Sequence, residues 1–402
     1  MNTDFRQTPW GPRPTDWQLV PWSSFATRAG RPIVVAPDAD LKQVTVRVRH
    51  QGITERRLNK NRRRRIGTPN QIQVSAGHFV ISKIDARNGA CGFIPHDLDG
   101  AIVTNDFPVY EIDGAADSRY LDHLVDLPVF WRLCESASDG TTNRVRLDLG
   151  LFDDLEFPMP PLHEQRAIAA VLDAIDEAIE RTEAVISDSE RLRDALLHEL
   201  LTRGVSGWHT EWRTVPGLGT IPANWQVMPL GDFATLQRGV DLPVQDRAPG
   251  SIPVYGSNGV LGDHSEALRA GPGVITGRSG SIGVVYYSSG PYWPLNTTLY
   301  VRDLHGNNAK FAYYLLTRFR LEKFAASTGV PSLNRNFVHP IPVAVPSRCE
   351  QMEIASILSF IDETLNIQRA EIDTVRLMKD SLSSELLTGK RRFTSRMKST
   401  VL

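Results

Sequence analysis

The sequence predicts an α+β protein that is built twice, with two globular domains and two long helices alternating along the chain. Three observations lead to this prediction. The segments Glu164–Thr202 and Glu350–Thr388 repeat one another without a gap, at an offset of 186 residues. A second, weaker repeat precedes each segment. The remaining stretches contain short strand-like runs and one helical run each, which indicates domains of mixed helix and strand.

Both repeated segments are predicted to be long helices, because their apolar residues recur every three or four positions. A helix of about 40 residues is roughly 60 Å long, which is too long to wrap one compact core. Two such helices can cover each other as an antiparallel coiled coil; the alternative is two ordinary amphipathic helices in separate domains. In the first copy the apolar positions are Ile168, Leu172, Ile175, Ile179, Ile186, Leu192, Leu196 and Leu200.

Proline-rich junctions lead into both helices, at Phe157–Pro161 and at Ile341–Pro346. Proline is favoured just before a helix and in its first turn. Each domain in turn opens on a Trp-Gln pair, at Trp17 and Trp225. These signals divide the chain into an N-terminal extension (1–16), a first domain (17–158), a central helix (159–203), a linker with the second domain (204–346), a C-terminal helix (347–390) and a tail (391–402).

Within the domains, short runs such as Phe79–Ile84 and Gly273–Thr276 have the composition of strands, and glycine and proline punctuate them. One helical stretch is expected in each domain, near Tyr120–Cys134 and Ala309–Ala326. The two domains match only in islands, whereas the helices match throughout. A shared framework therefore carries two divergent domains.

No apolar stretch reaches membrane-spanning length, and the N-terminal residues lack the apolar core of a signal peptide. The three cysteines are scattered, which fits neither a disulfide framework nor a zinc site. We therefore expect a cytoplasmic protein without a membrane partner.

The net charge of −1 conceals a strong asymmetry. The two repeated helices carry −6 and −5, so the rest of the chain carries +10. A basic surface of this kind suits binding to phosphate. The densest basic run is Arg56–Arg65. It could be a solvated loop or a charged strand edge, but inside a net-basic domain we favour contact with DNA phosphates, which positions DNA without reading it.

Paired variable domains, each followed by a proline-rich junction, Glu-Gln and a long helix closing on Glu-Leu-Leu-Thr, resemble the specificity subunit of type I restriction–modification systems. The islands Ser82–Gly89 and Gly100–Phe107 resemble a target recognition domain of that family, and the linker Trp208–Trp225 resembles its linker. The resemblance covers the chain from Trp17 to about Phe393. One departure is Arg203-Gly204 after the first Leu-Leu-Thr, where the second copy has Gly389-Lys390.

This resemblance implies a non-catalytic DNA-binding subunit in which each target recognition domain reads one half of an asymmetric bipartite site. The helices would set the spacing and dock two methyltransferase subunits, and the assembly can recruit a restriction subunit that translocates DNA. The chain itself would hold no cofactor or metal, because S-adenosylmethionine, ATP and Mg belong to the partner subunits. The alternative is a coiled-coil scaffold protein that does not bind DNA, which the basic domains argue against.

Reading bases requires Arg, Lys, Asn or Gln side chains at the edges of a DNA groove, held on loops of a rigid scaffold. The Asn-Arg pairs at 143–144 and 334–335 have an alternative role, stabilising a turn or clamping phosphates. The candidate DNA-binding residues are Arg62, Arg63, Arg64, Arg65, Lys83, Arg87, Asn88, Asn143 and Arg144 in the first domain and Arg278, Ser279, Ser281, Asn296, Asn334 and Arg335 in the second.

Catalytic readings fit the sequence poorly. A methyltransferase would need a glycine-rich cofactor loop and an Asn/Asp-Pro-Pro-aromatic motif, and the chain has neither. The run Gly277–Gly283 lacks the lysine of a phosphate-binding loop and a dinucleotide-binding context, so we interpret its glycines as a tight turn.

Overall fold

The computed structural model describes residues 5–37, 39–56, 66, 68–140, 145–326 and 331–392. The described residues fall into two compact units, the first within Met1–Thr182 and Glu371–Leu402, the second within Glu183–Ala370. The boundaries lie inside the two long helices, α4 (Leu162–Arg203) and α8 (Arg348–Leu387). Each unit therefore contains one domain and one half of each helix.

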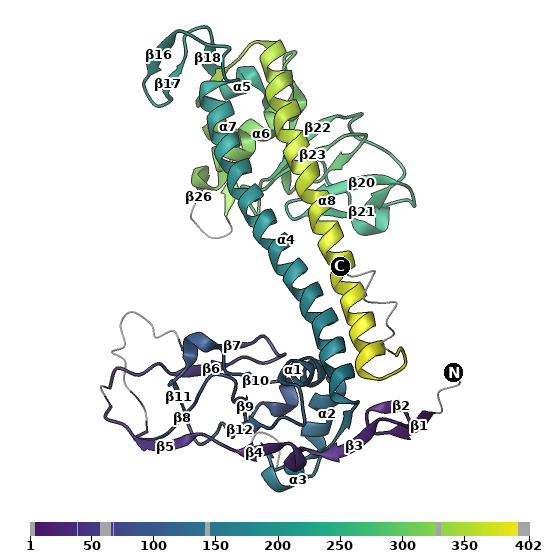
Figure 1. Cartoon of the computed structure of the whole chain (residues 1–402). Helices are drawn as coiled ribbons and strands as arrows, with labels where there is room; N and C mark the ends of the chain where they lie inside the picture. Colours follow the sequence, from purple (N-terminus) through teal and green to yellow (C-terminus); the bar gives the residue numbers. More distant parts are fainter. Residues whose placement is uncertain are drawn as a thin grey trace. The chain divides into compact units, whose positions relative to one another are not determined.

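The two long helices have the extent that the repeats predict, with 42 residues in α4 and 40 in α8 (Figure 1). Neither contains a proline or a glycine, so no backbone hydrogen bond is interrupted. The first unit holds the start of α4 and the end of α8, and the second unit holds the end of α4 and the start of α8. The helices are therefore antiparallel, which confirms the predicted framework.

One residue of the predicted apolar stripe lies elsewhere. Leu192 is 57% exposed, whereas its neighbour Arg193 is largely covered and its Nε donates to Asp362 Oδ1 at 2.9 Å. Leu192 follows Ile186 by six residues, which is out of step with a seven-residue repeat, and Arg193 follows it by seven. The coiled coil of the second unit therefore contains a half-buried ion pair where the sequence suggested a leucine.

The first unit contains a four-stranded sheet of order β10-β9-β12-β4 and a three-stranded sheet of order β11-β8-β5. Short hairpins β1-β2, β6-β7 and β13-β14 and the pair β3-β15 complete it. Its elements are β1 (Phe5–Thr8), β2 (Gly11–Pro14), β3 (Gln18–Pro21), β4 (Ala26–Arg28), β5 (Arg31–Val34), β6 (Val44–Val46), β7 (Ile53–Glu55), β8 (Asn70–Gln73), β9 (Phe79–Ile81), β10 (Cys91–Phe93), β11 (Ile102–Val103), β12 (Val109–Ile112), α1 (Ser118–Asp126), α2 (Pro128–Ser136), β13 (Ser138–Asp139), β14 (Arg146–Leu147), α3 (Leu149–Asp153) and β15 (Glu156–Met159).

The second unit repeats this plan, with a four-stranded sheet of order β19-β25-β22-β23 and a three-stranded sheet of order β21-β20-β24. The common plan agrees with the predicted twofold construction. Its elements are β16 (Trp212–Val215), β17 (Gly219–Pro222), β18 (Gln226–Pro229), α5 (Leu230–Phe233), β19 (Thr235–Arg238), β20 (Ile252–Gly256), β21 (Gly259–His264), β22 (Gly273–Gly277), β23 (Val285–Ser288), β24 (Trp293–Pro294), β25 (Thr298–Asp303), α6 (Ala309–Phe319), β26 (Ala325–Ala326), β27 (Ser332–Leu333), α7 (Arg335–Val338) and β28 (Pro342–Val345).

Each proline-rich junction contains a strand that pairs with the strand after the Trp-Gln opening of the same domain. This pairing explains why the opening and the junction are repeated together. In the first unit β15 pairs antiparallel with β3, the strand that follows Trp17. In the second unit β28 pairs in the same way with β18, which follows Trp225. Each long helix therefore begins directly after a strand that is fixed to the opening of its own domain.

The glutamine of the first Glu-Gln pair connects the domain to its helix. Gln165 Oε1 accepts a hydrogen bond from the backbone N–H of Asp117 at 2.9 Å, and Nε2 donates to the carbonyl of Pro160 at 2.9 Å. Asp117 is the N-cap of α1. One buried amide thus joins a helix of the domain to the junction strand and to α4.

The second copy makes the same connection. Gln351 Oε1 accepts from the backbone N–H of Asn308 at 2.9 Å, and Nε2 donates to the carbonyl of Pro346 at 3.0 Å. Asn308 is the N-cap of α6. The repeated glutamine is therefore a structural tether in both units.

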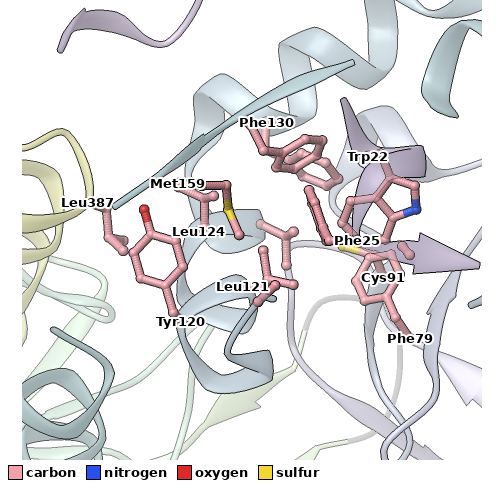
Figure 2. Packing of buried hydrophobic residues seen from close by; sticks show 14 of the residues in the cluster. Trp22, Phe25, Phe79, Cys91, Tyr120, Leu121, Leu124, Phe130, Met159 and Leu387 are labelled. Carbon is pink, nitrogen blue, oxygen red and sulfur yellow. The ribbon is translucent and has the colours of Figure 1, made fainter. Parts of the chain in front are cut away.

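Each unit has a core that is completed by both long helices. Figure 2 shows the core of the first unit, where Trp22, Phe25 and Phe130 pack together and Leu387 of α8 lies at one side. The core of the second unit includes Leu200 of α4 with residues of α5, α6 and α8. These helix ends therefore belong to the folded domains as well as to the coiled coil.

Each predicted helical stretch is interrupted in the structure. The stretch near Tyr120–Cys134 is two helices, because Leu127 precedes Pro128 and is extended (φ −67°, ψ 135°). In the second domain α6 ends at Phe319, and Arg320 has a left-handed backbone (φ 51°) that starts a new turn. Among the described residues, no helix has the length and hydropathy needed to span a bilayer.

Candidate nucleic-acid interface

The second unit contains a pocket of about 480 Å³ lined by four arginines, which we call the arginine pocket. The described residues that line it include no acidic side chain, so four positive charges share one concave surface. Strands β19 and β25, the loop after β22 and the start of α7 supply its walls. The lining residues are Gln237, Arg238, Arg278, Leu299, Arg302, Ser332, Leu333, Asn334 and Arg335.

Arg278 is held at the pocket by its backbone. Its N–H donates to the carbonyl of Thr297 at 2.8 Å, and its own carbonyl accepts from the N–H of Leu333 at 2.7 Å. The preceding Gly277 leaves no space for a side chain, because a Cβ there would lie 1.8 Å from the carbonyl oxygen of Ser281. The glycines therefore form a tight turn that presents Arg278, in agreement with the interpretation of this run as a turn.

The structure brings the predicted residues Arg278, Asn334 and Arg335 together in the arginine pocket. Asn334 is the N-cap of α7, since its Oδ1 accepts from the N–H of Asn336 at 3.0 Å. Arg335 Nη1 donates to the carbonyl of Leu236 at 3.2 Å. These local bonds correspond to the turn-stabilising alternative for the Asn-Arg pair, and the arginine retains further donors that face the pocket.

The other predicted residues of the second domain lie outside the lining of the pocket. Ser279 forms an isolated β-bridge with Ser332, and Ser281 is exposed in the turn. Asn296 Nδ2 donates to Asp241 Oδ1 at 2.9 Å.

Sequence reasoning missed six residues of the pocket, and three of these, Gln237, Arg238 and Arg302, carry a charge or an amide. Gln237 and Arg238 lie on β19 and Arg302 lies on β25. These strands are far apart in the sequence, and only their pairing brings Arg302 close to the other two residues. For Gln237 and Arg238, the available signal was their position just beyond the repeated Phe-Ala-Thr, with Leu236 between.

In the first unit, Lys83 occupies the place of Arg278. Its N–H donates to the carbonyl of Asp106 and its carbonyl accepts from Leu147, both at 2.8 Å, which is the pattern that holds Arg278. The two domains therefore present one cation each at the same position of the shared plan. Next to it Arg146 forms an ion pair with Asp106, so this part of the first domain is less positive.

The loop after Lys83 carries the predicted Arg87 and Asn88. Asn88 Nδ2 donates to Asp85 Oδ1 at 3.1 Å, and its carbonyl accepts from the N–H of Arg49 at 2.6 Å. The β6-β7 turn thereby adds the exposed Arg49 to this basic loop. The predicted Arg62, Arg63, Arg64, Arg65, Asn143 and Arg144 lie outside the described residues.

An ion pair fixes the base of the same turn. His50 Nε2 lies 3.2 Å from Asp122 Oδ1 of α1. Burial disfavours the charged imidazole, but the interactions with Asp122 and Cys91 outweigh it and raise the pKa of His50 to about 11. Because burial also raises the pKa of Cys91 to about 11, its thiol is neutral at pH 7 and Asp122 is the partner that matters there.

Across the described part of the chain, no group of three or more His, Cys, Asp or Glu side chains could hold a metal ion. What the described domains offer at these loops is cationic and amide side chains on a rigid framework, which suits recognition of nucleic acid.

Comparisons with known proteins agree with this geometry. Residues 222–377 match the family model described as the type I restriction modification DNA specificity domain. The specificity subunit of the type I restriction enzyme MjaVIII from Methanocaldococcus jannaschii is 23% identical over 307 residues, which cover 69% of this chain and 71% of the relative. The second domain thus resembles the DNA specificity domain of type I systems, and the larger part of the chain resembles a type I specificity subunit.

Two solved structures share the fold of this chain. The S subunit of a type I restriction–modification system from M. genitalium has a TM-score of 0.57 at 16% identity, with 92% of this chain and 96% of that chain covered. A structure from work on assembly and conformational transition of the type I system also gives 0.57, at 13% identity, with 94% and 99% covered. These structures show the fold, whereas the match to the DNA specificity domain and the curated relative bear out the predicted function as a DNA-recognition subunit; the scaffold alternative is not favoured.

Proposed function

We propose that this specificity subunit reads an asymmetric bipartite DNA site, one half with each domain, while the antiparallel helices set the distance between the halves. The observation that carries the proposal is the shared placement of Arg278 and Lys83 in two domains whose surrounding residues differ. Because the residues around Arg278 and Lys83 differ, the two domains read different base sequences, and the common framework places both domains on one duplex.

The arginine pocket is the proposed contact of the second domain with DNA. Arg238, Arg278 and Arg335 neutralise phosphates or bind guanine edges, since guanidinium groups do both well. In the first domain Lys83, Arg87 and Asn88 act with Arg62–Arg65, for which we keep the proposed role in backbone contact.

The helices are the proposed docking surface for two methyltransferase subunits. In the second unit α8 exposes Met352, Phe360 and Ile367, which recur at seven or eight residues and so lie along one face. Apolar residues in such a row favour packing against a further helix, and the acidic residues around them favour a basic partner surface. Restriction subunits would join through the assembled complex.

We further propose that the chain has no catalytic role and acts in the cytoplasm. Methylation with S-adenosylmethionine, and any cleavage driven by ATP and Mg, would belong to the partner subunits. Methyl transfer by the purified chain alone would contradict this assignment.

The test exchanges residues 225–340 for those of a relative that recognises another site. After assembly with the methyltransferase subunits, the methylated sequences are determined. One half of the site should change and the other half should stay the same. If both halves change, independent reading by the two domains is wrong; if no duplex is bound even at low salt, the scaffold alternative returns.

A further inference from the structure

We propose that Gln237 is the base-reading side chain of the arginine pocket and that it recognises a hydrogen-bond acceptor, best supplied by guanine. The inference rests on the proposed function, because it assigns one residue of the DNA contact a role in specificity. It differs from the sequence prediction, which placed base reading on loop residues.

Gln237 has the rigid support that discrimination between bases requires. It lies on β19, where it pairs with Tyr300 of β25, and Tyr300 is buried in the domain. The side chain of Gln237 is half-buried and lines the arginine pocket. A side chain on a paired strand keeps its position better than one on a turn, so it can distinguish groups that differ by a single hydrogen bond.

Arg302 determines which end of the amide faces the pocket. Its Nη1 donates to Gln237 Oε1 at 3.2 Å. A guanidinium has donors only, so the opposite amide orientation would place N–H groups against N–H groups and is excluded. In the described part of the unit, Gln237 Nε2 has no hydrogen-bond partner, and both of its hydrogens remain available.

Three other polar side chains of the pocket are partly occupied by local hydrogen bonds. Asn334 uses its Oδ1 to cap α7, and Arg335 holds the carbonyl of Leu236. Arg238 Nε donates to the carbonyl of Asn296 at 3.3 Å. These arginines keep their charge for phosphates, which gives affinity without sequence information.

The chemistry of the free amide defines the base. In the major groove guanine presents two acceptors, O6 and N7, whereas cytosine presents an amino donor. Glutamine normally recognises adenine through both its carbonyl and its amino group, but here Arg302 occupies the carbonyl. Thymine and adenine present one acceptor each, O4 and N7, so a glutamine with only donors available prefers guanine, which presents two, and rejects cytosine.

The experiment uses the full chain assembled with its methyltransferase subunits and a DNA library in which each position of the site is randomised. Gln237→Ala should relax one position in the half read by the second domain, with guanine preference falling about tenfold. Gln237→Glu keeps an acceptor for Arg302 but has no donor, so preference should shift toward a base that presents an amino group. Gln226→Ala, an exposed glutamine on β18, is the matched control.

Thermal unfolding of each variant shows whether it folds, and Gln237→Glu provides a second readout if Gln237→Ala loses stability. An equal loss at every position, or an unchanged profile in both variants, would overturn the role of Gln237 while leaving the proposed function intact. A parent protein that directs methylation to no particular sequence would instead refute the proposed function, and this inference with it.

Discussion

Glu350 at the start of α8 accepts a hydrogen bond from His209 at 2.6 Å, and both side chains are almost fully buried, with exposed fractions of 2% and 5%. The same carboxylate accepts from the backbone N–H of Val205 at 3.1 Å and from Trp225 Nε1 at 3.0 Å. Val205 and His209 directly follow α4. The start of one long helix is thereby tied to the segment after the other.

Glu164, the equivalent residue at the start of α4, has the same role with another partner. Arg392, which follows α8, donates to both carboxylate oxygens of Glu164, at 2.9 and 3.0 Å. It also binds Asp16 at 2.8 and 2.9 Å. In both units, the glutamate at the start of one long helix thus binds the segment that follows the other long helix. The partner is a histidine in the second unit and an arginine in the first.

Glu350→Ala should loosen the segment 205–225 selectively. Three donors, two of them on buried side chains, lose their acceptor, which costs about 3 kcal/mol. Hydrogen exchange followed by mass spectrometry should show amides of this segment exchanging about 100-fold faster. Glu164→Ala is the matched control and should affect residues 5–16 instead. Equal effects of both variants on both segments would contradict the claim that each glutamate holds only the segment it binds.

Asp122→Asn should destabilise the first unit in a pH-dependent way. The pKa of His50 in the folded protein is about 11, above the ordinary value of 6.5. The stabilisation of the folded protein by charged His50 is therefore complete below pH 6.5 and is lost as the pH rises toward 11. Because Asp122 is 45% exposed, we expect about 1–2 kcal/mol at pH 6.

Thermal unfolding at pH 6 and pH 10 measures this difference. The gap between parent and variant should be larger at pH 6. Asp97→Asn, at another exposed carboxylate of the same domain, should show little change at either pH. A gap that does not narrow at pH 10 would exclude a charged His50 as its cause.

Arg238→Ala and Arg335→Ala should each weaken binding to duplex DNA and reduce its dependence on salt. Each phosphate contact contributes about 0.9 to the slope of log affinity against log salt. The assembled complex is titrated with labelled duplex from 50 to 200 mM salt, so that one lost contact lowers the slope by about one. Arg203→Ala on α4 removes the same charge outside the pocket and should leave the slope unchanged. Variants with the parent slope would place the pocket away from DNA.

Phe360→Asp should weaken association with methyltransferase subunits. Phe360 is 72% exposed on α8, so the change should alter the stability of the chain by less than about 0.5 kcal/mol. Loss of an apolar contact and insertion of a charge should reduce affinity at least about tenfold in calorimetry. Val244→Asp, at an exposed valine of the second domain, is the control. Unchanged affinity would move the docking surface elsewhere.

Repetition made the framework predictable from sequence. Matching residues at a fixed offset revealed the two helices, and the basic remainder indicated DNA. The reason for the repeated Glu-Gln pair was hidden, because Glu350 meets a residue 141 positions away and Gln351 one 43 positions away. Such contacts leave no local pattern.

The candidate site was predictable only where it lies on loops. Arg278 follows a glycine, Asn334 and Arg335 repeat the Asn-Arg pair of the first domain, and all three were identified from sequence, whereas Arg238 and Arg302 meet through strand pairing. Leu192 is the opposite case, because its sequence pattern led to a wrong prediction. Its apolar character suggested burial, but the phase of the helix places Arg193 in the seam.

The tether made by Gln165 and Gln351 has an evolutionary consequence. Each glutamine binds mainly main-chain atoms, the N–H of the N-cap residue of a domain helix and the carbonyl of a junction proline. Main-chain groups are the same whatever side chains surround them. Side chains of a domain can therefore diverge without loss of these hydrogen bonds, so the domain can acquire new recognition residues while its attachment to the helix stays the same.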